Sequence, residues 1–110
     1  MTAGPTVRAE PCCLPQRIER SDRERAGEVA AVAKVLADPV RIEILDLLRH
    51  AGAQVCQCDL HPLFGISQPT LSHHLKKLAD AKLIEVERRG KWAYYSINDQ
   101  ALEVLRSWLS

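Results

Sequence analysis

The stretch VCQCDLHPLFGISQPTLSHHLKKL, residues 55–78, decides the fold of this chain. A cap at Cys58 or Asp59 predicts a short helix. Gly65 then predicts a turn, and Ser67 is a favourable cap for a second helix. A short helix, a glycine-containing turn and a second helix are typical of the helix-turn-helix, in which the second helix enters the major groove of DNA.

The second helix has one apolar side, and its other sides are polar. Leu71, Leu75 and Leu78 repeat at helical spacing and predict the buried side. Glutamine pairs with adenine, serine and threonine reach base edges or phosphates, and lysine attracts phosphate. An ordinary solvated helix face is the alternative for the lysines. The residues of this segment that we expect to contact DNA are Ser67, Gln68, Thr70, Ser72, His73 and Lys76.

A β-hairpin follows the second helix. Residues 83–87 alternate between apolar and charged side chains, and residues 92–97 are rich in aromatic and β-forming residues. Between them lie Arg88, Arg89 and Lys91, which we expect to contact the DNA backbone. A helix-turn-helix followed by a basic hairpin is a winged helix. The predicted fold class is therefore mainly α with a small β-hairpin, a winged helix-turn-helix.

Two helices are expected before this unit. Ser21 and Glu24 have the spacing of a capping box, which predicts the start of the first helix. Asp38 is expected to cap the next helix, Pro39 suits its first position, and Gly52 is expected to end it. The expected buried side of this helix consists of Ile42, Ile44, Leu45 and Leu48.

A last helix is expected from about Asp99, and its apolar stripe predicts a dimer. A protein that reads two half-sites of DNA must be paired, and a chain of 110 residues has a limited core of its own. We therefore expect the stripes of the first and last helices to pack across a two-fold axis. The expected interface residues are Val29, Val32, Leu102, Leu105, Trp108 and Leu109.

Composition and charge limit the other possibilities. The formal net charge is only +1, so a DNA-binding face must come from local clusters of basic residues. No apolar run is long enough to span a bilayer and the first residues lack a signal-peptide pattern, which together indicate a cytoplasmic protein. Three prolines in residues 1–20 predict a flexible N-terminal arm, and residues 21–110 are expected to form the winged-helix DNA-binding and dimerisation domain.

The four cysteines occur as two close pairs, Cys12 with Cys13 and Cys56 with Cys58. In a reducing compartment such pairs favour metal ligands or sensors over a disulfide framework. Small buried hydrophobic residues are the alternative. Within a regular helix Cys56 and Cys58 would point in nearly opposite directions, so both can bind one ion only if Cys56 precedes the helix on extended chain.

Four segments of the chain form a recognisable set: ADPVRIEILDLL (37–48), VCQCDL (55–60), SQPTLSHHLKKL (67–78) and RRGKWAYYSI (88–97). With these segments, residues 28–109 resemble the ArsR/SmtB family of metal-responsive winged-helix repressors. The resemblance implies a homodimer that binds operator DNA and releases it when metal binds. In that family, the position of His74 is tied to folding of the recognition helix more often than to DNA contact.

The VCQCDL segment resembles the branch that senses arsenic, antimony, cadmium and lead. Well-known arsenical sensors of the family carry a third cysteine where this chain has His61, and Cys12 with Cys13 resembles a variant branch in which an N-terminal pair completes the site. The expected ligands of As(III) or Sb(III) are therefore Cys12, Cys13 and Cys56, with Cys58 as a secondary candidate. Trigonal sulfur coordination suits these ions more than it suits Zn(II). No organic cofactor is expected.

Three alternatives remain at this point. In the first alternative, the inducer is Cd(II), Pb(II) or Hg(II), and Cys58 or His61 is an added ligand. In the second, the thiols sense oxidation and bind no metal. An enzyme such as an arsenate reductase is disfavoured, because no cysteine lies in a glycine-rich anion-binding loop before a helix. The zinc site that the family places on its last helix is expected to be absent, since residues 98–110 contain no histidine.

Overall fold

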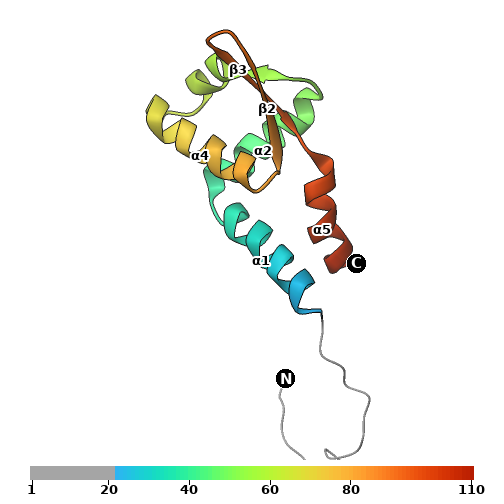
Figure 1. The fold of residues 1–110 in the computed structure, drawn as a ribbon. Helices are drawn as coiled ribbons and strands as arrows, with labels where there is room; N and C mark the ends of the chain where they lie inside the picture. Colours follow the sequence, from blue (N-terminus) through green and yellow to red (C-terminus); the bar gives the residue numbers. More distant parts are fainter. Residues whose placement is uncertain (1–21) are drawn as a thin grey trace, which may run out of the picture.

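A computed structural model describes residues 22–110 of the chain (Figure 1). None of the helices in this range is both long enough and apolar enough to pass through a membrane. The elements follow in the order α1 (Arg23–Leu36), α2 (Pro39–Ala51), β1 (Val55–Cys56), α3 (Gln57–Leu60), the 3₁₀ helix η2 (His61–Leu63), α4 (Gln68–Asp80), β2 (Ile84–Arg89), β3 (Trp92–Ile97) and α5 (Asp99–Leu109).

Asp22, and not Ser21, caps α1. Its carboxylate oxygen Oδ1 accepts hydrogen bonds from the backbone N–H of Glu24 at 3.0 Å and of Arg25 at 3.3 Å. The predicted cap at Ser21 is therefore wrong by one residue, and Ser21 itself lies outside the described residues. An aspartate satisfies the free N–H groups of a first turn as well as a serine does, which explains why the neighbour takes this role.

The predicted limits of α2 are confirmed. Asp38 Oδ1 accepts from the backbone N–H of Val40 at 2.9 Å and of Arg41 at 3.3 Å, and Pro39 occupies the first turn. Gly52 ends the helix with φ 64°, in the left-handed region where a side chain would be strained.

The short helix of the helix-turn-helix begins earlier than predicted. Cys56, with φ −70° and ψ 141°, is the cap of α3, so neither Cys58 nor Asp59 has that role. Val55 and Cys56 form strand β1, which pairs with Tyr95 and Tyr94 of β3. This strand was not predicted, because a two-residue strand has no sequence period of its own and depends on its partner.

The three strands form an antiparallel sheet in the order β1-β3-β2. In the hairpin Ile84 pairs with Ile97 and Arg89 with Trp92, which confirms the predicted wing and extends its first strand to Arg89. Gly90 has φ 62° in the two-residue turn, a conformation that tight hairpins require. The hairpin tip lies at one end of the molecule, and α1 and α5 lie side by side at the other (Figure 1).

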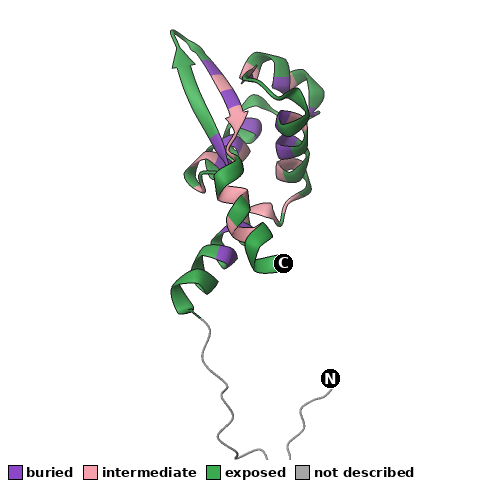
Figure 2. Ribbon diagram, turned by 90° about the vertical axis from the view of Figure 1, so that its right-hand side faces the viewer, coloured by how far each residue is buried: buried purple, intermediate pink, exposed green. Residues whose placement is uncertain are grey.

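The core lies where α2, α3 and α4 meet the sheet (Figure 2). The apolar stripe of α4 is confirmed, since Leu71, Leu75 and Leu78 are fully buried. On α2 the prediction holds except for Ile42, which is 46% exposed. Ile42 follows the buried stripe by sequence spacing, but it lines an open pocket with Leu36, Ile97 and Leu102, which cover it only in part.

The predicted dimer residues divide into two groups. Val29 and Val32 are buried within the chain itself, because α1 packs against α5. Leu102 and Leu105 are half-buried, whereas Trp108 is 57% and Leu109 is 68% exposed. The apolar surface left for a partner is therefore concentrated at the end of α5, and the interface itself stays a prediction.

Candidate nucleic-acid interface and adjoining cysteine pair

The outer face of α4 presents polar side chains to solvent. All six residues that we expected to contact DNA from this helix and its cap are exposed, whereas the leucines of the opposite side are fully buried. Three of the six also make side-chain contacts within the helix, since Lys76 Nζ donates to Asp80 Oδ2 at 3.4 Å and Ser67 bonds Thr70. The Ser67 hydroxyl accepts from the backbone N–H of Thr70 at 3.3 Å and donates to Thr70 Oγ1 at 2.9 Å. Ser67 therefore fixes the start of the helix that carries the other side chains.

The basic residues of the wing differ in their surroundings. Arg89 donates from Nε to Glu87 Oε2 at 3.2 Å, also bonds Gln54, and stacks over the ring of Tyr94 with Cζ 4.4 Å from its centroid. Arg88 has no ion pair within residues 22–110, and it is exposed. Of these two arginines, Arg88 has the side chain that is more available for phosphate.

The Glu87 carboxylate accepts hydrogen bonds from both Arg89 and Gln54, and these three residues form a cluster on the wing. Hydrogen bonds from Arg89 and from Gln54 Nε2, the latter at 2.7 Å, lower the pKa of Glu87 below its ordinary value of 4.5. The same bond to Glu87 raises the pKa of Arg89. Gln54 precedes β1, so the cluster joins the loop after α2 to the wing. Sequence reasoning did not find Gln54, because nothing local to it indicates a partner 33 positions away.

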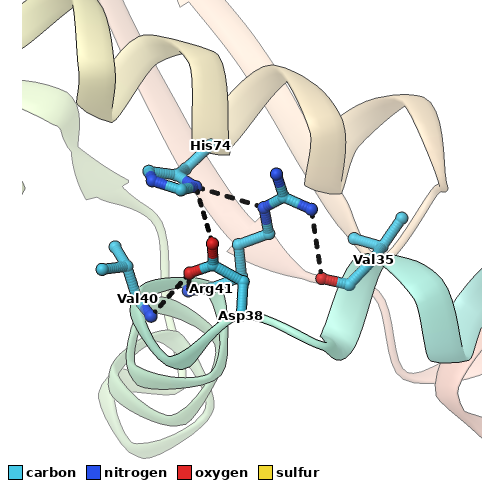
Figure 3. A network of polar contacts seen from close by, with 5 residues as sticks. All are labelled: Val35, Asp38, Val40, Arg41 and His74. Atoms are coloured by element: carbon cyan, nitrogen blue, oxygen red, sulfur yellow. Dashed lines mark hydrogen bonds and ion pairs between the residues drawn. The ribbon is translucent and has the colours of Figure 1, made fainter.

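A polar network joins the recognition helix to the start of α2 (Figure 3). Arg41 donates from Nε to His74 Nδ1 at 3.1 Å and from a terminal nitrogen to the Val35 carbonyl at 3.3 Å. Asp38 Oδ2 lies 4.0 Å from His74 Nδ1, and the His74 side chain is only 12% exposed. His74 thus points into the protein, unlike its exposed neighbour His73.

This network stabilises the ionised form of the Asp38 carboxylate. Partial burial raises the pKa of Asp38, but the backbone N–H groups of Arg41 and Val40, with the nearby side chains of His74 and Arg41, outweigh that effect and lower the pKa below its ordinary value of 3.8. Asp38 was predicted only as a helix cap. Its second contact, with α4, needed the tertiary structure to be seen.

The structure brings Cys56 and Cys58 together at the start of α3. Their sulfur atoms are joined as a disulfide, with the Cα atoms 5.1 Å apart, and Cys56 Sγ accepts from the backbone N–H of Cys58 at 3.3 Å. Because Cys56 lies on extended chain before the helix, the condition for both thiols to reach one ion is met. Cys56 is buried and Cys58 is exposed, so the pair is open to solvent on one side.

The described residues supply no third ligand beside this pair. No group of three histidine, cysteine, aspartate or glutamate side chains within residues 22–110 is arranged to hold a metal ion. His61 follows on η2, and its Nε2 lies 3.0 Å from the Ile66 carbonyl, an interaction that ties the ring to the turn before α4. Cys12 and Cys13, the other predicted ligands, lie outside the described residues.

The sequence and the fold also agree with those of known proteins. Residues 38–86 match the family described as bacterial regulatory protein, arsR family. The chain is 44% identical over 78 residues to the arsenical resistance operon repressor of Staphylococcus xylosus, covering 71% of this chain and 73% of that protein. The chain belongs to the arsR family. The arsR-family match spans the helix-turn-helix and the first half of the wing.

Two solved structures of winged-helix regulators support the fold. The AntR antimony-specific transcriptional repressor aligns with a TM-score of 0.67 and 28% identity over 94% of this chain and 92% of that one. A homodimeric winged helix-turn-helix DNA-binding domain from Mycobacterium bovis, described as a possible ArsR-family regulator, aligns with a TM-score of 0.64 and 30% identity over 84% and 86% of the two chains. This arsR-family chain is thus a DNA-binding transcriptional repressor and not an enzyme.

Proposed function

We propose that this repressor binds operator DNA as a homodimer and that As(III) or Sb(III), held by cysteine thiolates, releases it. The observation that carries the proposal is the convergence of Cys56 and Cys58 directly before the helix-turn-helix. Thiolates bind a soft ion at about 2.3 Å, as in zinc sites, so two sulfurs on one ion lie within about 4 Å of each other. Once reduced, the two cysteines are close enough in the chain to meet that requirement.

The third sulfur is proposed to come from the N-terminal segment. Trivalent arsenic accepts three thiolates, and residues 22–110 offer only two at this place. The contact between Cys56 and Cys58 favours Cys58 as the second ligand, which leaves one position for Cys12 or Cys13. A site made of Cys12, Cys13 and Cys56 is the competing arrangement, and counting the sulfur ligands in cysteine variants separates the two.

The DNA-binding half of the proposal rests on α4 and the wing. Exposed hydrogen-bonding groups on α4 suit base edges, and exposed Lys76, Arg88 and Lys91 suit phosphates. The end of α5, with Trp108 and Leu109 exposed, is the proposed core of the dimer contact. The relative from M. bovis that is described as homodimeric supports a dimer.

The proposal is tested by an operator-binding titration with arsenite under reducing conditions. Arsenite is expected to weaken operator binding of the wild type, and Cys56→Ser is expected to bind the operator normally but to stay bound when arsenite is added. Gln100→Met, on the exposed side of α5, serves as a control that should behave as wild type. Release of Cys56→Ser at the same arsenite concentration as wild type would contradict the proposal.

X-ray absorption of the arsenite-bound protein identifies the ligands. Three sulfur neighbours are expected in the wild type and two in Cys58→Ser. Three sulfurs in Cys58→Ser would instead support the set Cys12, Cys13 and Cys56. A parallel titration with Cd(II), Pb(II) and Hg(II) tests whether a divalent soft ion is the better inducer.

A thiol-oxidation sensor is the second candidate function. The observation that favours it is the pairing of Cys56 and Cys58, whose two thiols give a disulfide and two water molecules with one equivalent of hydrogen peroxide. Peroxide in the absence of any metal would then release the operator, and a thiol reductant would restore binding. If peroxide has no effect while arsenite releases the DNA, this second function is excluded.

A further inference from the structure

The side chain of Gln57, the residue between the two cysteines, bridges the wing and the recognition helix. Its Nε2 donates to Ser72 Oγ on α4 at 2.8 Å, and its Oε1 accepts from the Tyr95 hydroxyl on β3 at 3.3 Å. The amide of Gln57 therefore donates a hydrogen bond to α4 and accepts one from β3. Its own backbone belongs to the first turn of α3.

The two partners of Gln57 belong to the surfaces that read DNA. Ser72 lies on the exposed face of α4, among the residues expected to contact bases. Tyr95 is 6% exposed and anchors the wing strand β3, where it also pairs with Val55 of β1. Burial raises the pKa of Tyr95, so its hydroxyl stays protonated and can donate at neutral pH.

The bridge crosses a groove of about 410 Å³ between α4 and the hairpin. Gln57, Ser72 and Tyr95 line this groove, and so do Lys76 and Arg88, two of the cations expected to contact phosphate. The relative position of α4 and the wing determines whether both can contact one stretch of duplex. A side chain that bonds both Ser72 and Tyr95 across the groove therefore helps to fix the position of α4 relative to the wing.

We propose that Gln57 is the positioning residue that transmits occupation of the cysteine site to the DNA-binding face. This inference rests on the proposed function, since it assumes that Cys56 holds the inducer. Cys56 Sγ accepts from the Cys58 N–H at 3.3 Å, so the sulfur also shapes the backbone on which Gln57 stands. When the sulfurs bind an ion, residues 56–58 adjust to its geometry and the Gln57 amide moves away from Ser72 and Tyr95. The two hydrogen bonds that connect α4 with the wing are then lost.

The test compares Gln57→Met, which keeps the length of the side chain and removes both hydrogen bonds, with wild type and with Gln100→Met. Three quantities are measured for each protein: arsenite affinity without DNA, operator affinity without arsenite, and operator affinity with saturating arsenite. Allosteric ligands usually change affinity by about 5-fold to 150-fold. In wild type and Gln100→Met the ratio of the two operator affinities is expected in that range. In Gln57→Met it is expected to fall toward one, with arsenite affinity unchanged.

Two further variants test the hydrogen bonds of the bridge. Tyr95→Phe removes the contact to β3 and is expected to lower the ratio while every proposed DNA-contacting side chain is kept. Gln57→Glu can keep both contacts, because its carboxylate accepts from the Tyr95 hydroxyl and from a rotated Ser72 hydroxyl, and it is expected to keep a ratio near that of wild type. A thermal melt of each variant shows that the fold is retained.

The outcomes separate the two proposals. If wild type is released by arsenite and Gln57→Met is released equally, the role of Gln57 is overturned and the proposed function stands. If Gln57→Met loses arsenite affinity, the residue acts at the ion site and the inference is also overturned. If wild type itself is not released, the proposed function fails and this inference fails with it.

Discussion

Arg41 of α2 donates a hydrogen bond from Nε to Nδ1 of His74 on the recognition helix, across a distance of 3.1 Å. The bond joins the recognition helix α4 to α2, the helix that Asp38 caps. The two adjacent histidines therefore differ. His73 is exposed to solvent, whereas the His74 side chain is only 12% exposed and contacts α2.

Replacing His74 by alanine is expected to destabilise the protein. The change leaves Arg41 Nε without its partner at a partly buried position, and an unsatisfied group of this kind costs about 1–3 kcal/mol. The free energy of unfolding is measured by urea denaturation. His73→Ala is the matched control and should weaken operator binding without loss of stability. Equal stability losses in both variants would show that the bond to Arg41 is not important.

The charge of Asp38 is expected to make stability depend on pH in the acid range. Because the folded-state pKa of Asp38 lies below its ordinary value of 3.8, the carboxylate stabilises the fold above that pH, and the contribution is lost as the pH falls below it. Asp38→Asn keeps a good helix cap and removes the charge. Urea unfolding at pH 7 and pH 3 should show the variant less stable than wild type at pH 7, with a smaller difference at pH 3. A constant difference would contradict the lowered pKa.

Arg88 and Arg89 are expected to differ in the salt dependence of operator binding. Each phosphate contact contributes about 0.9 to the slope of log affinity against log salt concentration. Arg88→Ala should therefore lower the slope by about one per subunit, whereas Arg89→Ala should lower it less and should lower the melting temperature more, since Arg89 is held by Glu87 and Tyr94. The slope is measured by fluorescence anisotropy at several salt concentrations. The reverse order would place Arg89 on the phosphate backbone.

Introducing a charge at Trp108 is expected to weaken the dimer. Trp108 is 57% exposed in the single chain, so Trp108→Glu should leave the subunit folded, but burying a carboxylate in a central contact should raise the dimer dissociation constant by about 30-fold, which corresponds to about 2 kcal/mol. Sedimentation equilibrium measures this constant. Trp92→Glu, at an exposed position on the wing, is the control. If both variants dimerise as wild type does, the interface lies elsewhere.

Local signals in the sequence were sufficient for the winged helix-turn-helix. The leucine spacing of α4, the cap at Asp38, the left-handed glycine at position 52 and the alternation of the hairpin each depend on residues within a few positions of one another. Such features are fixed by backbone geometry and by the period of the helix or strand. For that reason the order of α2, α4 and the wing, and the exposed face of α4, were predicted correctly.

The shortest elements could not be predicted in the same way. Strand β1 contains two residues and exists because β3 pairs with it, and α3 begins at Gln57 because the pairing holds Cys56 extended. The contact between Cys56 and Cys58 depends on the same strand pairing. Whether two nearby cysteines converge depends on where the helix starts, and that start was set by a strand almost 40 positions later.

The helices, the wing and the thiols beside the recognition helix could be inferred from the amino-acid sequence, since they follow from local propensity and apolar period. The side chains that meet across elements became visible with the packed fold: Arg41 with His74, Arg89 with Gln54, and Gln57 with both Ser72 and Tyr95. Polar contacts of this kind leave no period in the sequence. They form only after burial of the leucine core has fixed the distances between the elements that carry them.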